Sequence, residues 1–225
     1  MGTSKTDLEK RFDSGTAYVS LIPNVLPNTD RKLTDQQKLD DFFVQKVGPP
    51  TVSIRSFLKT DKESSKLVKT ARSLNDCRCR KLFIHKMLPA IVVPVKVWSR
   101  DFTQPYESLI KEYNSLILLE FPVSQGTGRL ISLLKTLPWV WYITLSADGE
   151  NILAIVPLDN SDYYEHHRFY EALKREFSKR GFQILDRCEE LVTLMFKTDD
   201  PQAWMNEHCT LYRLPRHRKQ TINEE

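Results

Sequence analysis

The stretch SLILLEF, residues 115–121, is the most informative part of this chain for its fold. It is short and almost wholly apolar, and Glu120 is its single charged residue. An apolar run of this length without alternation is typical of a central strand that is buried on both faces of its sheet. We therefore take residues 115–121 as the first strand of the main sheet and extend the prediction outward from it.

The residues after this strand predict an alternation of helices and strands. Gly126 and Gly128 open a helix with leucines at helical spacing, and Asp148-Gly149 is a strong signal for a hairpin turn. Gly181 is suited to cap a long helix, because glycine readily adopts the left-handed conformation. The expected strands are 115–121, 139–145, 151–158, 182–186 and 190–196. The expected helices are 126–137, 162–180 and a short last one from Asp200 to Asn206. In the helix 162–180, the residues expected to face inward are His166, Phe169, Tyr170, Leu173 and Phe177.

In chain order, residues 115–197 predict β-α-β-β-α-β plus one extra strand. This order predicts the α+β class, and within it a ferredoxin-like or RRM-like antiparallel sheet with two helices on one face. The other face of such a sheet is open. Residues from three places can converge on this open face: the end of the first strand, the hairpin at Asp148-Gly149, and the last two strands.

The first half of the chain predicts a smaller α+β extension. Residues 17–22 and 51–59 have strand composition, and residues 62–75 carry an apolar helical face. Thr34 and Gln37 form a capping box that opens another helix. Residues 90–98 also have strand composition, but Pro94 limits them to a sheet edge or an irregular extended segment. We expect four parts: a flexible N-terminus (1–16), an N-terminal α+β subdomain (17–110), an RRM-like core (111–212) and a basic tail (213–225).

The composition is that of a globular protein rather than a disordered one. Of the 225 residues, 40% are hydrophobic and 28% are charged, and the formal net charge of +4 permits nucleic-acid binding without demanding it. No apolar run is long enough to cross a membrane, and the first ten residues lack the apolar core of a signal peptide. We therefore expect a cytoplasmic protein with no membrane partner, whose four cysteines are reduced thiols.

An ordered series of motifs over residues 17–212 resembles the N-terminal domain family of VirE-type proteins from Bacteroides mobile elements. The matching stretches are HKMLPAIVV (85–93), LILLEFP (116–122), SADGENILAIV (146–156), the helix with His166 and His167 followed by Gly181 and Asp186, and FKTDDPQAWMN (196–206). This family is related to the archaeo-eukaryotic primase superfamily. The resemblance implies a role in DNA replication or mobile-element maintenance, with single-stranded DNA and a replication helicase as partners.

The resemblance also implies where a catalytic site would lie. Primases of this type hold two Mg²⁺ ions with carboxylates, and Glu120 and Asp186 are the expected metal ligands here, with Asp148 as a third catalytic acid. Three departures weaken that site. Asp148 and Asn151 stand in the hairpin where the family has a serine and its second glycine. Pro122 stands where the family has a second acid two residues after Glu120, and Thr193 stands where it has an arginine. The simpler interpretations are a solvent-facing or paired Glu120, a turn residue at Asp148 and a strand-end turn at Asp186.

Several other residues are candidates for ligand binding. The possible phosphate contacts are Arg78, Arg80, Lys81, Lys86, Ser146, Arg213, Arg216, Arg218 and Lys219, although basic runs of this kind are more often plain solvated surface. Of the adjacent His166 and His167, we expect one to face the core and the other the solvent. Cys77 and Cys79 are spaced too closely for a usual structural zinc site. Trp139 and Trp141 are expected to pack in the core from one strand face.

The leading hypothesis is a standalone, degenerate primase-like domain that binds nucleic acid or a replication protein. One alternative is an active primase or polymerase that uses Mg²⁺ and rearranged carboxylates. The other is a protein-interaction module without catalytic activity. The arrangement of Glu120, Asp148 and Asp186 decides between the first two hypotheses, because a two-metal site requires carboxylates that face one another.

Overall fold

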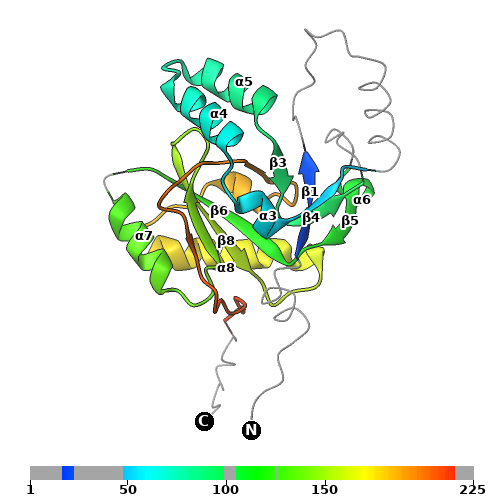
Figure 1. The fold of residues 1–225 in the computed structure, drawn as a ribbon. Coiled ribbons are helices and arrows are strands. Elements are labelled where there is room, and N and C mark those ends of the chain that lie inside the picture. Colours follow the sequence, from blue (N-terminus) through cyan, green and yellow to red (C-terminus); the bar gives the residue numbers. More distant parts are fainter. Residues whose placement is uncertain (1–16, 23–47, 99–104, 125, 216–225) are drawn as a thin grey trace, which may run out of the picture.

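The computed structural model describes residues 17–22, 48–98, 105–124 and 126–215, and these residues form an α+β fold with antiparallel sheets (Figure 1). The strands are β1 (Tyr18–Ile22), β2 (Thr51–Ser53), β3 (Ala90–Val92), β4 (Val95–Val97), β5 (Ile110–Tyr113), β6 (Leu116–Pro122), β7 (Tyr142–Leu145), β8 (Asn151–Pro157), β9 (Leu194–Phe196) and β10 (Trp204–Met205). The helices are α3 (Ile54–Leu58), α4 (Lys62–Ser73), α5 (Cys77–Met87), α6 (Tyr106–Leu109), α7 (Thr127–Thr136) and α8 (His166–Lys179), with 3₁₀ turns η1 (Tyr163–Glu165) and η2 (Asp186–Glu189).

The larger antiparallel sheet has the strand order β10-β7-β8-β6. β6 pairs with β8 along its whole length, from Leu116 opposite Pro157 to Pro122 opposite Asn151. The turn between β7 and β8 is closed by Gly149 at a φ of 77°, as the Asp-Gly signal predicts. The order β6-β8-β7 is the one expected for the first three strands of an RRM-like sheet. β6 ends the sheet, however, so the prediction that it is a central strand is wrong.

The expected fourth and fifth strands differ from the prediction. Residues 182–185 run beside β6 but make one backbone hydrogen bond to it, from Leu185 N to Glu120 O at 2.9 Å, and then turn into η2. Of residues 190–196 only β9 is a strand, and it pairs with β3 in the second sheet. The expected last helix is a turn followed by β10, which pairs with β7. There the Asp200 carboxylate accepts a hydrogen bond from Leu145 N at 2.8 Å and ends β7.

The second sheet joins the two halves of the chain, in the order β2-β1-β3-β9. β3 is an interior strand, so the sheet edge expected for residues 90–98 is wrong for β3, whereas the alternative, an irregular extended segment, agrees with the break at Pro94. The proline lies in the break between β3 and β4, and β4 forms a separate hairpin with β5. β2 is short because residues 54–58 form α3, which buries Ile54 and Phe57. The helix predicted from Thr34 and Gln37 lies outside the described residues.

Both faces of the β6-β8-β7 sheet are covered. Alternate residues Ile117, Leu119 and Phe121 pack against α7 and α8. Leu116 and Leu118 point the other way, into a core shared with β1, α3, β3 and β9. α7 and α8 therefore lie on one side, as predicted, but the opposite face packs on the second sheet and is not open (Figure 1).

α8 is built as its apolar pattern predicts. His166, Phe169, Tyr170, Leu173 and Phe177 are all buried on its inner side. Gly181, at a φ of 81°, ends the helix with a hydrogen bond from its N–H to Ser178 O at 2.9 Å.

Trp139 and Trp141 lie in different cores. Trp139 packs beside Phe177 and Tyr212 on the α8 side of the sheet, whereas Trp141 lies in the core on the opposite side. These two residues precede β7, so the period-two prediction that they share one face is wrong.

α4 and α5 form a helical hairpin over the β7–β8 turn. Both helices begin with an aspartate cap: Asp61 accepts from Ser64 N at 2.8 Å, and Asp76 from Cys79 N at 2.7 Å. Their facing apolar residues, Val68, Ala71, Ile84 and Leu88, pack together with Ala147 of the turn. Among the described residues, no helix combines the length and the apolar character needed to span a membrane.

Arg72 fastens this hairpin to the main sheet. Its guanidinium donates hydrogen bonds to Ser146 O at 2.8 Å and to Asp199 O at 3.0 Å. Burial lowers the pKa of Arg72, and Asp200, Asp199 and Asp148 oppose that shift. An arginine nevertheless stays charged at any physiological pH. We therefore treat Arg72 as a fixed, charged clamp between α4 and the sheet.

We expect Arg72→Met to lower the free energy of unfolding by about 1–3 kcal/mol, because two partly buried carbonyls no longer have a donor. Urea unfolding measures this decrease. Lys69→Met, on the exposed side of α4, is the matched control and is expected to change stability by less than about 0.5 kcal/mol. Equal stability of the two variants would contradict the clamp.

Candidate functional site

Glu120 is a buried carboxylate near the end of β6. It has the same strand parity as Leu116 and Leu118, so it points toward the second sheet rather than toward α8. It is 4% exposed, and its carboxylate accepts a charge-assisted hydrogen bond from the Arg187 guanidinium. Burial raises the pKa of the Glu120 carboxyl, and Arg187 offsets part of that rise. Glu120 is thus engaged inside the fold.

Asp148 closes the β7–β8 turn. Its carboxylate accepts hydrogen bonds from the Ser146 hydroxyl and from Glu150 N, the latter at 3.0 Å. The Ser146 oxygen in turn accepts from Asn151 N at 3.0 Å, across the base of the turn. The Asp148 charge helps to raise the pKa of both Glu120 and Arg187, so it lies near that pair. Its contacts are those of a turn residue.

Asp186 points away from the other two acids. Its side chain is 84% exposed and forms an ion pair with Lys174 Nζ of α8 at 2.7 Å. Tyr170 also donates to it, at 3.3 Å, and Lys174 lowers the pKa of the Asp186 carboxyl. Among the described residues, Glu120, Asp148 and Asp186 do not form a group whose ligand atoms are close enough to share a metal ion. The carboxylates expected to hold Mg²⁺ are therefore not brought together, and Pro122 supplies no replacement.

The predicted phosphate contacts fall into four groups. Arg78 and Lys81 are exposed on α5. Arg80, Arg213 and Ser146 are engaged within the fold: Arg80 pairs with Glu150 at 2.8 Å, and Arg213 pairs with Asp159 at 2.8 Å. Lys86 is half-buried at the end of α5. Arg216, Arg218 and Lys219 lie outside the described residues.

The structure adds a lysine ridge that the sequence interpretation missed. Lys62, Lys66 and Lys69 are all exposed on α4 and, spaced four and three residues apart, lie along one side of the helix. They line a shallow groove with Thr60, Asp61, Ser65 and Thr70. None of the three lysines forms an ion pair with another described residue. The signal that could have found them is a helical period of lysines opposite the apolar face of residues 62–75.

Comparisons with protein-family models, with curated proteins and with solved structures found no match to this chain. The resemblance to VirE-type domains thus remains an expectation from sequence.

His166 and His167 divide between core and solvent, as predicted. His166 is 1% exposed, its Nδ1 lies 2.8 Å from the Tyr113 hydroxyl, and burial lowers its pKa to about 4. It is therefore a neutral core residue at pH 7. The His167 side chain is 59% exposed and contacts Glu189.

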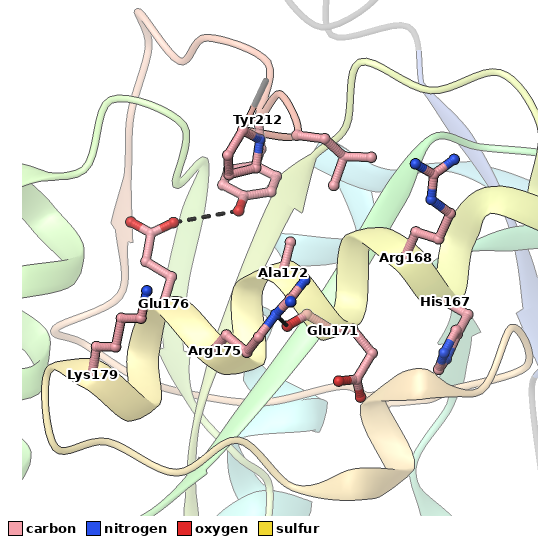
Figure 2. A pocket seen from close by; sticks show the side chains of 10 residues that line it. His167, Arg168, Glu171, Ala172, Arg175, Glu176, Lys179 and Tyr212 are labelled. Carbon is pink, nitrogen blue, oxygen red and sulfur yellow. Dashed lines mark hydrogen bonds between the residues drawn. The ribbon is translucent and has the colours of Figure 1, made fainter. Parts of the chain in front are cut away.

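A cavity of about 530 Å³ lies beside α8, between this helix and residues 212–215 (Figure 2). Arg168, Arg175 and Lys179 bring positive charge to its lining, and His167, Glu171 and Glu176 complete the polar part. The Tyr212 hydroxyl donates to Glu176 at 3.3 Å across it. This cavity is on the far side of α8 from the β6-β8-β7 sheet, so it is separate from Glu120.

We expect Arg187→Ala to destabilise the protein at pH 7 by about 1–3 kcal/mol, because it leaves the Glu120 carboxylate buried without its partner. The double variant Arg187→Ala/Glu120→Gln is expected to recover part of that stability, since the uncharged amide costs less to bury. Urea unfolding of both variants and of the parent protein gives the comparison. A double variant as unstable as Arg187→Ala would contradict the role of the buried charge.

The same pair has a predictable pH dependence. The folded-state pKa of Glu120 is raised, so the folded protein binds a proton more readily than the unfolded chain does. The contribution of Glu120 to stability is therefore greatest below the usual glutamate pKa of about 4.3 and falls as the pH rises through its folded-state pKa. The destabilisation caused by Arg187→Ala should shrink between pH 7 and pH 5. Arg168→Ala, which removes an exposed pair with Glu165, should have little effect at either pH.

Proposed function

We propose that this protein is a nucleic-acid-binding module without polymerase activity, and that the α4–α5 hairpin supplies its contacts to phosphates. The observation that carries the proposal is the concentration of positive charge on this hairpin. Residues 59–86 hold nine Lys and Arg against three Asp and Glu, whereas the rest of the chain holds 24 against 26. The net charge of +4 therefore understates a strongly basic local surface.

The side chains on this surface are available for binding. Lys62, Lys66 and Lys69 of α4, and Arg78 and Lys81 of α5, are exposed and form no ion pair with another described residue. Each phosphate that a protein neutralises releases condensed counterions, which is the main source of affinity in sequence-independent binding. Phosphate contacts position a nucleic acid without reading its bases. We therefore expect weak sequence preference.

The rest of the fold favours this mode over base stacking on a sheet. The β6-β8-β7 sheet packs against helices on one side and against the second sheet on the other. No face of that sheet is left on which bases could stack as they do in RRM domains. A role in DNA replication or mobile-element maintenance, together with a helicase, would agree with the VirE-type resemblance and stays part of the proposal.

We expect the triple variant Lys62→Gln/Lys66→Gln/Lys69→Gln to bind a fluorescein-labelled 20-nucleotide single strand at least tenfold more weakly at 50 mM salt. The slope of log K against log salt should also fall by about 0.7 for each phosphate that the variant no longer neutralises. Fluorescence anisotropy over a salt series measures both. The same assay with a duplex of equal length shows which form is preferred.

The matched control is Lys111→Gln/Lys135→Gln/Lys179→Gln, which removes the same charge from exposed lysines outside the hairpin. Equal weakening of binding in the two triple variants would mean that net charge, and not the hairpin, determines affinity. Metal-dependent primer synthesis that Glu120→Ala abolishes would overturn the non-catalytic part of the proposal.

A further inference from the structure

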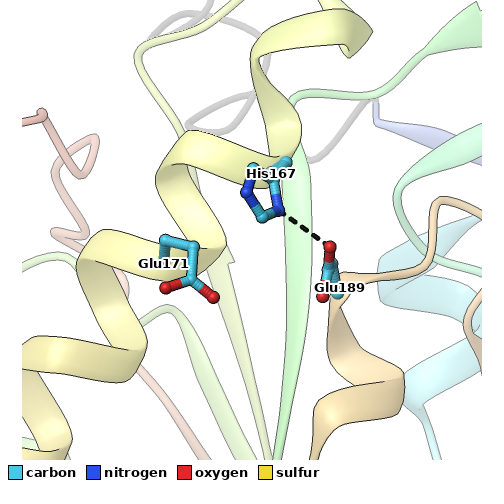
Figure 3. A group of neighbouring side chains, drawn as sticks. All are labelled: His167, Glu171 and Glu189. Carbon is cyan, nitrogen blue, oxygen red and sulfur yellow. Dashed lines mark hydrogen bonds and ion pairs between the residues drawn. The ribbon is translucent and has the colours of Figure 1, made fainter.

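A second cluster of chemically active side chains lies on α8 and η2, outside the α4–α5 hairpin. His167 and Glu171 are four residues apart on α8, so both project from the same side of the helix. Glu189, at the end of η2, faces them (Figure 3). One ligand atom from each residue lies within 4.8 Å of those of the other two, and the His167 Nδ1 to Glu189 Oε1 distance is 2.8 Å.

The two carboxylates in this cluster are not neutralised by arginine or lysine. Glu189 Oε1 lies 2.8 Å from His167 Nδ1, and the Glu171 carboxylate makes no hydrogen bond or ion pair with another described residue. Two arginines of α8 that adjoin the cluster in sequence make other contacts: Arg168 pairs with Glu165, and Arg175 Nε donates to the main-chain oxygen of Glu171 at 3.2 Å. Two carboxylates and a neutral imidazole together carry the charge that balances a divalent cation.

We propose that His167, Glu171 and Glu189 bind a divalent transition-metal ion of the zinc type. The ligand set supports this class, because imidazole nitrogen suits zinc and its neighbours in the first transition row better than it suits magnesium or calcium. The 2.8 Å between the His167 and Glu189 atoms is a hydrogen-bond distance, whereas two ligands at about 2.1 Å from one tetrahedral ion lie about 3.4 Å apart, so these two side chains must separate slightly to admit the ion. Small side-chain rotations of Glu171 complete the set.

The site is open on one side. Three protein ligands leave at least one coordination position for water or for a ligand from solution. His167 and Glu171 also line the cavity beside α8, where Arg168, Arg175 and Lys179 contribute positive charge (Figure 2). The free position is therefore next to a cationic pocket.

A bound ion would join η2 to α8. η2 carries Arg187, the partner of Glu120, and Cys188, whose sulfur accepts from Glu120 N at 3.1 Å. Holding Glu189 on α8 would thus fix the short segment on which these buried contacts depend. A ligand that binds the folded state alone raises the apparent stability, so zinc should raise the Tm of the protein.

The test is a zinc titration by isothermal calorimetry in a Cys77→Ser/Cys79→Ser background, which removes the two exposed thiols of α5 as competing ligands. We expect one zinc ion per chain. His167→Ala, Glu171→Gln and Glu189→Gln should each weaken binding at least tenfold and abolish the zinc-induced rise in Tm. His208→Ala, at another exposed histidine, is the matched control and should bind as its parent does.

Retention of the zinc affinity in His167→Ala or Glu171→Gln would overturn the proposal, as would the absence of any saturable binding in the parent. Urea unfolding without metal checks that the variants fold, which is expected because the His167 side chain is 59% exposed. A two-dimensional NMR spectrum of the histidine rings adds a direct readout. The His167 ring signals should shift on zinc addition, and those of the buried His166 should stay close to their metal-free positions.

Discussion

The burial of β6 on both faces is the constraint on which the rest of this structure depends. Every residue from Leu116 to Phe121 is buried, and alternate side chains enter two different cores. A strand of this kind requires a layer on each side, here α7 and α8 on one side and the second sheet on the other. The single acid in the strand, Glu120, must then be paired inside the protein, and Arg187 supplies its partner.

This constraint also determines where a ligand can bind. A sheet covered on both sides has no face to offer, and the end of β6 is occupied by the Glu120–Arg187 pair. Both proposed binding surfaces accordingly lie on peripheral elements, one on the outer side of the α4–α5 hairpin and the other on the outer side of α8. Neither surface contributes much to the two main cores, so their polar side chains are free to vary without a large decrease in stability.

The parts of the fold that are predictable from sequence are those whose signal is local. The α8 pattern, the Gly181 cap and the Asp148-Gly149 turn need no information beyond a few neighbouring residues. Residues 182–186 and 190–196 are wrongly predicted as strands of the main sheet because short apolar runs indicate burial and not the partner strand. β9 pairs instead with β3, about 100 residues earlier, a choice made by packing between distant segments.

The candidate sites show the same limit. The order of the motifs along the chain suggests that Glu120, Asp148 and Asp186 share one site. The directions of the Glu120 and Asp186 side chains depend, however, on the position of Glu120 in its strand and on the η2 turn. These direct Glu120 toward the second sheet and Asp186 toward α8. His167 and Glu171 form a pair that helical spacing reveals, whereas Glu189 joins them only after η2 folds back on α8. The lysines of α4 have a local signal too, on the side of the helix opposite the apolar residues.

The chemistry of the cations separates those that build the fold from those available to a ligand. On the α4–α5 hairpin the inward-facing cations are arginines: Arg72 donates to two carbonyls, and Arg80 donates to Leu74 O and pairs with Glu150. A guanidinium suits this role, because its planar set of donors satisfies several fixed acceptors at once. The unpaired cations of α4 are all lysines, whose flexible, well-hydrated ammonium groups can follow a phosphate chain without a fixed geometry. Arginines therefore fasten the inner side of the hairpin to the protein, and its outer side carries the three lysines of α4 together with Arg78 and Lys81 of α5, an arrangement that fits the binding of a charged polymer.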